Sequence, residues 1–116
     1  MNTPHIDSYR FGHIVVDGRA YSKDMIILPD RIIANWWRKE GHTLHPEDLE
    51  EVLAARPDLL VVGQGAHGRM RITAEASKSL ELAEIALVAE PTEQACRTYS
   101  QLRGQQAVAA ALHLTC

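Results

Sequence analysis

Residues 59–68 read LLVVGQGAHG, an apolar run that stops at a cluster of glycines. A short, continuous apolar run before a glycine is typical of a strand that is buried on both faces. Glycine lets the following loop turn sharply and approach a neighbour closely. We therefore predict a central strand here. The crevice beyond its carboxyl end is where a ligand is expected, since open α/β sheets bind ligands at that edge.

The residues that follow predict a second strand parallel to the first. Thr73 is suited to cap a helix over residues 74–83, which leads to another apolar run at residues 85–88. A strand–helix–strand crossover makes its two strands parallel, so Gly63 and Glu90 should lie at the same edge of the sheet. Thr92 is a candidate N-cap for a last helix that stops before Gly104. The small apolar residues 107–114 then indicate a final buried strand.

The first half of the chain predicts antiparallel strands. Asp17-Gly18 lies between extended runs and is typical of a two-residue hairpin, because a type I′ turn requires positive φ at both central residues. Pro29-Asp30 separates two more apolar runs and marks another turn. Pro46 begins the clearest helix, which Pro57 stops. These patterns predict an α/β fold with N-terminal antiparallel strands or hairpins, a partly parallel sheet and about three helices.

Length and composition favour one domain over residues 1–116, with a short flexible N-terminus at about residues 1–6. The net charge of −3 argues against a nucleic-acid partner. Cys96 and Cys116 do not suit a disulfide framework or a zinc spacing, which favours a reducing compartment. No run approaches the ~20 apolar residues of a membrane span, and the first residues do not resemble a secretion signal. We therefore expect a soluble, cytoplasmic protein with no membrane partner.

Three stretches resemble the domain-of-unknown-function family 498: residues 61–65 (VVGQG), Thr92 with residues 95–102 (ACRTYSQL), and residues 108–112 (VAAAL). That family comprises small proteins of bacteria and archaea, the mitochondrial respiratory complex I assembly factor 3, and an adipogenesis-associated protein of animals. The resemblance implies a three-layer α/β fold with a central mixed sheet. It implies no established activity, cofactor or catalytic residue. The family usually has threonine and asparagine where this chain has Gln64 and Ser100, so a pocket role of those family side chains would not carry over.

The glycine cluster also spells the dinucleotide-binding fingerprint G-x-G-x-x-G, and Glu90 ends the next strand. In that motif the helix opens within the glycine turn, whereas here residues 69–72 come first. We therefore interpret the glycines as allowing a tight turn and close packing, and expect no nicotinamide or flavin cofactor. A weaker hypothesis is a small anion held by the loop amides, two arginines and the start of the last helix. This candidate pocket comprises Gly63, Gln64, Gly65, His67, Gly68, Arg69, Arg71, Thr92 and Tyr99.

The reactive side chains do not predict a catalytic or metal site. His42 and His45 are close in sequence, but no acid stands at a supporting metal spacing, and the other histidines are scattered. Cys96 falls on the apolar face of the last helix, which is typical of an inert core cysteine. A thiolate pair of Cys96 with His113 or His67 is the alternative that we weighed.

Trp36 and Trp37 form the candidate interface. One interpretation places one ring in the core and the other half-covered at the rim; the other makes the pair an exposed anchor, since tryptophan is enriched at interface hot spots. Two functional hypotheses follow. The first is a non-enzymatic interaction or assembly protein that binds a partner protein near these tryptophans or along a sheet edge, with homo-oligomerisation left open. The second is a small-molecule or anion-binding domain, an enzyme included, that uses the crevice at residues 63–68 and the helix start near Thr92.

Overall fold

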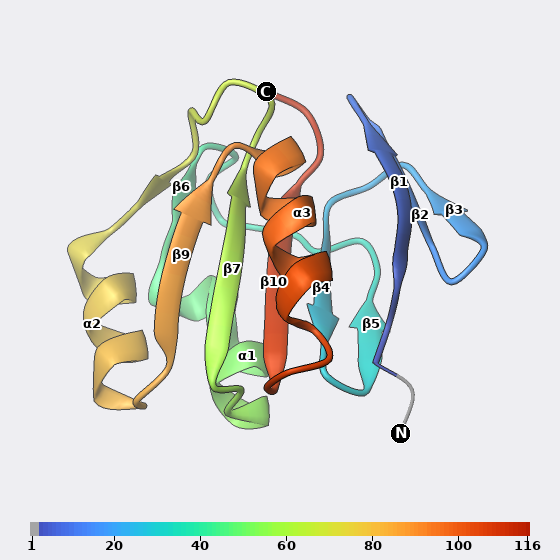
Figure 1. Cartoon of the computed structure of the whole chain (residues 1–116). Coiled ribbons are helices and arrows are strands. Elements are labelled where there is room, and N and C mark those ends of the chain that lie inside the picture. The colour runs from blue at the N-terminus through green and yellow to red at the C-terminus, as the bar shows by residue number, and fades with distance from the viewer. Residues whose placement is uncertain (1–2) are drawn as a thin grey trace.

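The apolar run at the glycine cluster forms strand β7 (Leu59–Gln64), which lies beside the middle strand of a five-stranded sheet in the order β5-β4-β10-β7-β9. The computed structural model describes residues 3–116 (Figure 1). β7 runs parallel to both of its neighbours, β10 (Val108–His113) and β9 (Ala86–Glu90). Gly63 pairs with Glu90 in this register, so the prediction that the two strands end at one edge is confirmed.

The other strands of the central sheet are antiparallel, which makes the sheet mixed. β4 (Met25–Leu28) pairs with β10, and β5 (Arg31–Ile33) pairs with β4 across the predicted turn at Pro29-Asp30. A separate antiparallel sheet contains β1 (Ile6–Arg10), β2 (His13–Val16) and β3 (Arg19–Tyr21). Asp17 and Gly18 join β2 to β3 with φ of 50° and 77°, which confirms the predicted hairpin.

Three layers result from covering both faces of the central sheet (Figure 1). α3 (Thr92–Leu102) and the β1-β2-β3 sheet cover one face, where Tyr99, Ile14 and Val61 share a core. α2 (Ala74–Leu82), α1 (Glu50–Ala55) and the 3₁₀ helix η1 (Pro46–Leu49) cover the other, where Leu80, Val52 and Leu60 share a second core. The three-layer α/β fold is therefore confirmed.

The alanine-rich strand β10 illustrates why burial overrides local propensity. Alanine favours helix in isolation. Ala110 nevertheless belongs to one core, and Ala109 and Ala111 belong to the other, with every residue of the strand buried. Small side chains on both faces let the covering layers approach the sheet closely, so the predicted buried strand is confirmed.

Some local features differ from the sequence-based predictions. The helix that begins at Pro46 starts as η1 and ends with Arg56 in the left-handed region, φ 50°. A two-stranded parallel pair, β6 (Thr43–Leu44) with β8 (Arg71–Ile72), lies in segments for which the sequence predicts no strand. Of the N-terminal residues 1–6, Met1 and Asn2 lie outside the described residues. The Pro4 carbonyl accepts a hydrogen bond from Tyr99, and Ile6 opens β1.

Candidate functional site

The glycine loop after β7 packs tightly against its neighbours. A Cβ on Gly63 would lie 2.9 Å from Thr92 Oγ1 and 3.0 Å from Leu112 Cδ2. Gly65 has a φ of +94°, and a Cβ there would lie 2.9 Å from both His113 Cδ2 and the Thr115 carbonyl oxygen. Gly63 requires glycine because Thr92 and Leu112 leave no room for a Cβ, and Gly65 requires it both for the same steric reason and because its backbone is left-handed.

Thr92 joins the strand ends at this edge. Its Oγ1 accepts a hydrogen bond from the Gly65 amide at 2.9 Å and donates one to the His113 carbonyl at 2.6 Å. The prediction that Thr92 is the N-cap of the last helix is wrong: Thr92 is the first helical residue and Pro91 occupies the cap position. The side chain ties β7 and β10 together instead of capping its own helix.

The loop amides are largely engaged within the chain. The Ala66 amide donates to the Thr115 carbonyl at 2.7 Å, and the Met70 amide donates to the Gln64 carbonyl at 3.0 Å. The Gly68 amide donates to the Gly65 carbonyl at 3.2 Å. The Gln64 side chain is also used, since its Nε2 donates to the Met70 carbonyl at 2.9 Å.

The structure brings only part of the candidate pocket together. Gly63, Gly65 and Thr92 are in contact, whereas the side chains of His67, Arg69 and Arg71 are exposed. Tyr99 is buried further along α3, where its hydroxyl donates to the Pro4 carbonyl at 2.5 Å and burial raises its pKa to about 12. The small-anion hypothesis stays a prediction, and it would depend on the arginine side chains more than on the loop amides.

A buried polar cluster lies next to this loop: Asp24, Arg38 and His113. Asp24 Oδ2 lies 2.8 Å from His113 Nδ1 and 2.9 Å from Arg38 Nη1. Asp24 Oδ1 accepts a hydrogen bond from the Leu114 amide at 2.8 Å. The exposed fractions of the three side chains are only 17%, 5% and 8%. The cluster therefore joins the start of β4, the end of β10 and the segment after the tryptophan pair.

The electrostatics of the cluster favour an ionised Asp24. Burial by itself would raise the pKa of Asp24, but the hydrogen bonds from His113 and the Leu114 amide, together with the positive charges of His113 and Arg38, lower it below the ordinary value of 3.8. The ionised carboxylate accepts a hydrogen bond from His113 Nδ1, and the other ring nitrogen, Nε2, is buried. Among the described residues, this buried Nε2 has no hydrogen-bond partner. The Arg38 Nη1 contact with Asp24 is close in distance but lacks hydrogen-bond geometry.

Sequence reasoning missed Asp24 and Arg38 because no local pattern links them to His113. The one available signal was His113 itself, a titratable residue at the end of a strand of small apolar residues. An aspartate that orients a histidine is the arrangement of many general bases. Here the imidazole is enclosed, and its ring meets that of His42 edge to face at a centroid distance of 5.6 Å.

The tryptophan pair lies on the same segment as Arg38. Trp36 is 8% exposed and its Nε1 donates to the Asp48 carbonyl at 3.0 Å, whereas Trp37 is 80% exposed. The Arg38 guanidinium stacks over the Trp36 ring at 4.7 Å. Because Trp36 and Arg38 both turn inward, the residue between them is directed to the outside.

The exposed indole borders a surface hollow of about 460 Å³. The hollow lies between the loop before β4 and the C-terminal residues, and its lining includes Lys23, Asp24, Asn35, Trp36, Trp37 and Thr115. Asp24 therefore belongs to two features: it lines this hollow, and it forms part of the buried cluster with Arg38 and His113. We call this surface the Trp37 hollow.

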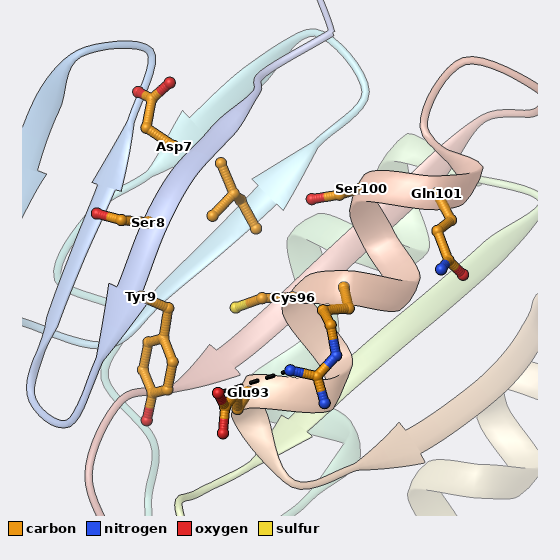
Figure 2. Close-up of a pocket in the computed structure, with 9 residues that line it drawn as sticks. Asp7, Ser8, Tyr9, Glu93, Cys96, Ser100 and Gln101 are labelled. Carbon is orange, nitrogen blue, oxygen red and sulfur yellow. Dashed lines mark ion pairs between the residues drawn. The ribbon is translucent and has the colours of Figure 1, made fainter.

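A second hollow, of about 400 Å³, lies between β1 and α3 (Figure 2). Ile6 and Cys96 are its buried residues, and burial raises the pKa of the Cys96 thiol to about 12. A neutral, buried thiol is what the core interpretation of Cys96 predicted. Of the two histidines weighed as partners of Cys96, His113 is engaged by Asp24 and His67 is exposed.

Within residues 3–116, no group of three or more His, Cys, Asp or Glu side chains is placed to hold a metal ion. No helix of that same part of the chain is long and apolar enough to cross a membrane.

The structure is a small three-layer α/β domain with a mixed central sheet, and its surface carries the two hollows described above. The chain belongs to the family of proteins of unknown function DUF498/DUF598, whose model matches residues 6–113. It is similar to the conserved hypothetical protein PH1505 from Pyrococcus horikoshii OT3, with 30% identity, a TM-score of 0.83, and coverage of 96% of this chain and 98% of that one. It is also similar to the protein MT938, with 27% identity, a TM-score of 0.80, and coverage of 97% and 99%.

A protein described as an outer membrane protein from Bartonella henselae has the same fold. Its TM-score is 0.84 at 24% identity, and the match covers 98% of this chain and 97% of that one. At this level of identity the similarity concerns the fold alone.

Proposed function

We propose that this protein is a non-enzymatic docking protein of the assembly-factor kind, which acts in the cytoplasm and binds a partner protein through the Trp37 hollow. The observation that carries the proposal is the 80% exposure of Trp37 on a backbone that is held on both sides. Tryptophan is enriched at interface hot spots, where a large ring enters a pocket of the partner. The resemblance to a family with an assembly factor among its members supports the same class of function.

Hydrogen bonds of the two residues that flank Trp37 fix the position of its backbone. The Trp36 amide donates to the Asp24 carbonyl at 2.8 Å, and Arg38 Nη2 donates to the Gly41 carbonyl at 2.8 Å. The backbone on either side of the indole is therefore already ordered in the free protein. Binding then costs less conformational entropy than it would for a tryptophan on a loose loop.

The charge and hydrogen-bonding groups of the hollow beside the indole indicate what kind of partner surface would fit it. Asp24, which lines the hollow, is paired with Arg38 and hydrogen-bonded to His113, so the hollow presents no isolated buried charge. Lys23 and Asn35 supply hydrogen-bond donors at its rim. We expect a partner surface that accepts the indole in an apolar recess and places a small polar side chain in the hollow.

Quantitative affinity capture followed by a binding measurement tests the proposal. Wild-type protein, Trp37→Ala and Leu82→Ala are compared as baits; Leu82 is the matched control because it is 74% exposed and lies on α2, away from the hollow. A partner that binds wild type and Leu82→Ala should bind Trp37→Ala about 30-fold more weakly, as expected for a hot spot of about 2 kcal/mol. Equal affinity of the purified partner for Trp37→Ala and wild type would refute the proposal.

A further inference from the structure

We infer that the partner segment bound at the Trp37 hollow is acidic: it places a carboxylate in the hollow and rests apolar side chains on Trp37 and Phe11. Because it concerns the same surface, this assignment rests on the proposed docking function and names the chemistry of the partner. The surface offers a second exposed aromatic ring, hydrogen-bond donors without partners, and unpaired positive charges.

Phe11 is the second exposed aromatic residue near the hollow. It is 58% exposed and lies in the turn between β1 and β2. The Gly12 amide donates to the Leu114 carbonyl at 2.8 Å, and a Cβ on Gly12 would lie 3.7 Å from Thr115 Cγ2. Thr115 in turn lines the Trp37 hollow. The segment that follows β10 therefore links the Phe11 turn to the hollow, so one partner segment can contact both rings.

The hollow itself offers hydrogen-bond donors that the chain leaves unused. Four polar side chains line it with no hydrogen bond or ion pair of their own within residues 3–116: Ser22, Lys23, Asn35 and Thr115. The carboxylate in the lining, that of Asp24, is already engaged by Arg38, His113 and the Leu114 amide. A carboxylate of the partner would supply the acceptor that these donors lack, and charge-assisted hydrogen bonds are the strong ones.

The unpaired charges around the hollow are positive. Lys23 lines it, and Lys39 lies two positions after Trp37 and is exposed, as Trp37 is. Arg10 is exposed at the turn that carries Phe11. In the part of the chain that the structure describes, none of these three cations forms an ion pair.

The acidic residues that contact the segment after Trp37 are already engaged. The carboxylate of the buried Asp48 accepts hydrogen bonds from the amides of Lys39 and His45, at 3.2 and 2.8 Å. Glu40 pairs with the His45 ring at 2.7 Å. The lysine charges are therefore available to a partner.

The sign of this surface differs from that of the whole chain. The net charge is −3, but the excess of acid is confined to residues 46–58 and 74–84, which hold eight acidic and two basic side chains. The remaining residues hold ten basic and seven acidic side chains. Complementary charge steers association and selects the partner, so an acidic segment is favoured at the basic hollow.

A nucleic acid also combines negative charge with flat rings, but it fits this surface less well. Binding to phosphates depends on many cationic contacts, roughly six to ten in a typical DNA-binding protein. Here three cations surround the hollow, and the Asp24 carboxylate lines it. An acidic peptide needs only a few such contacts, because its apolar side chains bind the two aromatic rings.

The test uses a displayed library of random peptides, selected against the full chain. Enriched peptides are synthesised with a fluorescent label, and their binding is measured by fluorescence polarisation. We expect an excess of acidic over basic residues in them, together with apolar or aromatic side chains. Acetate, which has the carboxylate but no apolar group, and single-stranded oligothymidylate should not displace the peptides.

Charge reversal gives the decisive comparison. Lys39→Glu changes an exposed lysine beside the indole, and Lys78→Glu makes the same change at an exposed position of α2. We expect Lys39→Glu to weaken peptide binding about tenfold at low salt and less as salt rises, because salt screens the attraction. Lys78→Glu should bind as wild type does. Lys23→Gln, expected to weaken binding about threefold, replaces Lys39→Glu if that variant fails to fold.

The aromatic contact has its own matched pair. Phe11→Ala should weaken peptide binding about fivefold, as expected for a ring at the border of an interface. Leu82→Ala removes another exposed apolar side chain, on α2, and should leave binding unchanged. Equal binding of the two variants would remove Phe11 from the docking surface and overturn the two-ring assignment.

Failure of the inference is distinguishable from failure of the proposed function. Peptides that need Trp37 but show no acidic excess, or that bind Lys39→Glu as tightly as wild type, overturn the acidic assignment and leave the docking function intact. Peptides that bind Trp37→Ala as tightly as wild type contradict both. A selection that enriches no peptide, or displacement of the peptides by oligothymidylate, also overturns the assignment of an acidic protein segment.

Discussion

Asp24 Oδ2 lies 2.8 Å from His113 Nδ1, although 89 positions separate the two residues in the sequence. The contact forms where the antiparallel β4 and the parallel β7 flank opposite edges of β10. Arg38 completes the cluster and neutralises the carboxylate. The same aspartate lines the Trp37 hollow, so the stability of the domain and the shape of its candidate interface depend on one side chain.

Asp24→Asn is expected to destabilise the fold. The substitution leaves the Arg38 guanidinium buried without its counter-charge, and breaking a buried pair costs about 3–5 kcal/mol, of which we expect about 2–3 because Asp24 is partly exposed. Asp30→Asn is the control, since Asp30 and Arg31 form an exposed pair at 3.6 Å. Urea denaturation should show less than about 1 kcal/mol for the control. Equal losses in the two variants would contradict this account of the cluster.

The lowered pKa of Asp24 predicts a specific pH dependence. The folded-state pKa lies below the ordinary value of 3.8, so the unfolded state binds the proton first as the pH falls. The stabilisation is therefore complete above about pH 5 and is lost as the pH falls through the folded-state value. The difference in melting temperature between wild type and Asp24→Asn should shrink below about pH 4. A difference that stays constant from pH 7 to pH 3 would rule out this linkage.

Gly65→Ala is expected to be strongly destabilising. The residue has positive φ, and the new methyl group would lie 2.9 Å from the Thr115 carbonyl oxygen. Left-handed strain alone costs about 1–3 kcal/mol, and the steric contact adds to it. Gly104→Ala is the matched control, because a Cβ there meets nothing within 4 Å and the residue lacks a positive φ. Thermal unfolding should separate the two variants clearly.

The two tryptophans should differ in fluorescence. Trp36 is buried and Trp37 is exposed, so Trp37→Phe should remove the red-shifted emission and leave the blue-shifted signal of Trp36. Acrylamide should quench wild-type protein more strongly than Trp37→Phe. If the remaining emission of Trp37→Phe is quenched as efficiently as that of wild type, the assignment of the inward and outward rings is wrong.

A thermal-shift screen with phosphates, nucleotides and carboxylates compares the docking proposal with the anion hypothesis. Because amides of Gly65, Ala66 and Gly68 already have partners within the chain, we expect no compound to raise the melting temperature measurably. Binding at 100 times Kd would add about 2.7 kcal/mol of stability, which the assay detects readily. A stabilisation that the double variant Arg69→Ala/Arg71→Ala loses would support the anion pocket instead.

Several elements could be read from local sequence because their causes lie within a few residues. The apolar run before Gly63, the Asp17-Gly18 hairpin and the Thr73 cap of α2 each follow from short-range sterics or hydrogen bonding, and each is present. The parallel pairing of β7 with β9 followed from the helical crossover that connects them. These rules operate without knowledge of the remaining chain.

The candidate sites required the assembled layers. Trp36 and Trp37 are the same residue type side by side, and which ring points outward depends on the Asp48 carbonyl and on Arg38. The Asp24–His113 contact and the hollow between β1 and α3 depend on how separate segments dock, because side chains far apart in sequence meet only when register and packing are complete. Local patterns therefore established the strands and turns of this protein, whereas the choice of which side chains meet and which stay exposed came from long-range packing.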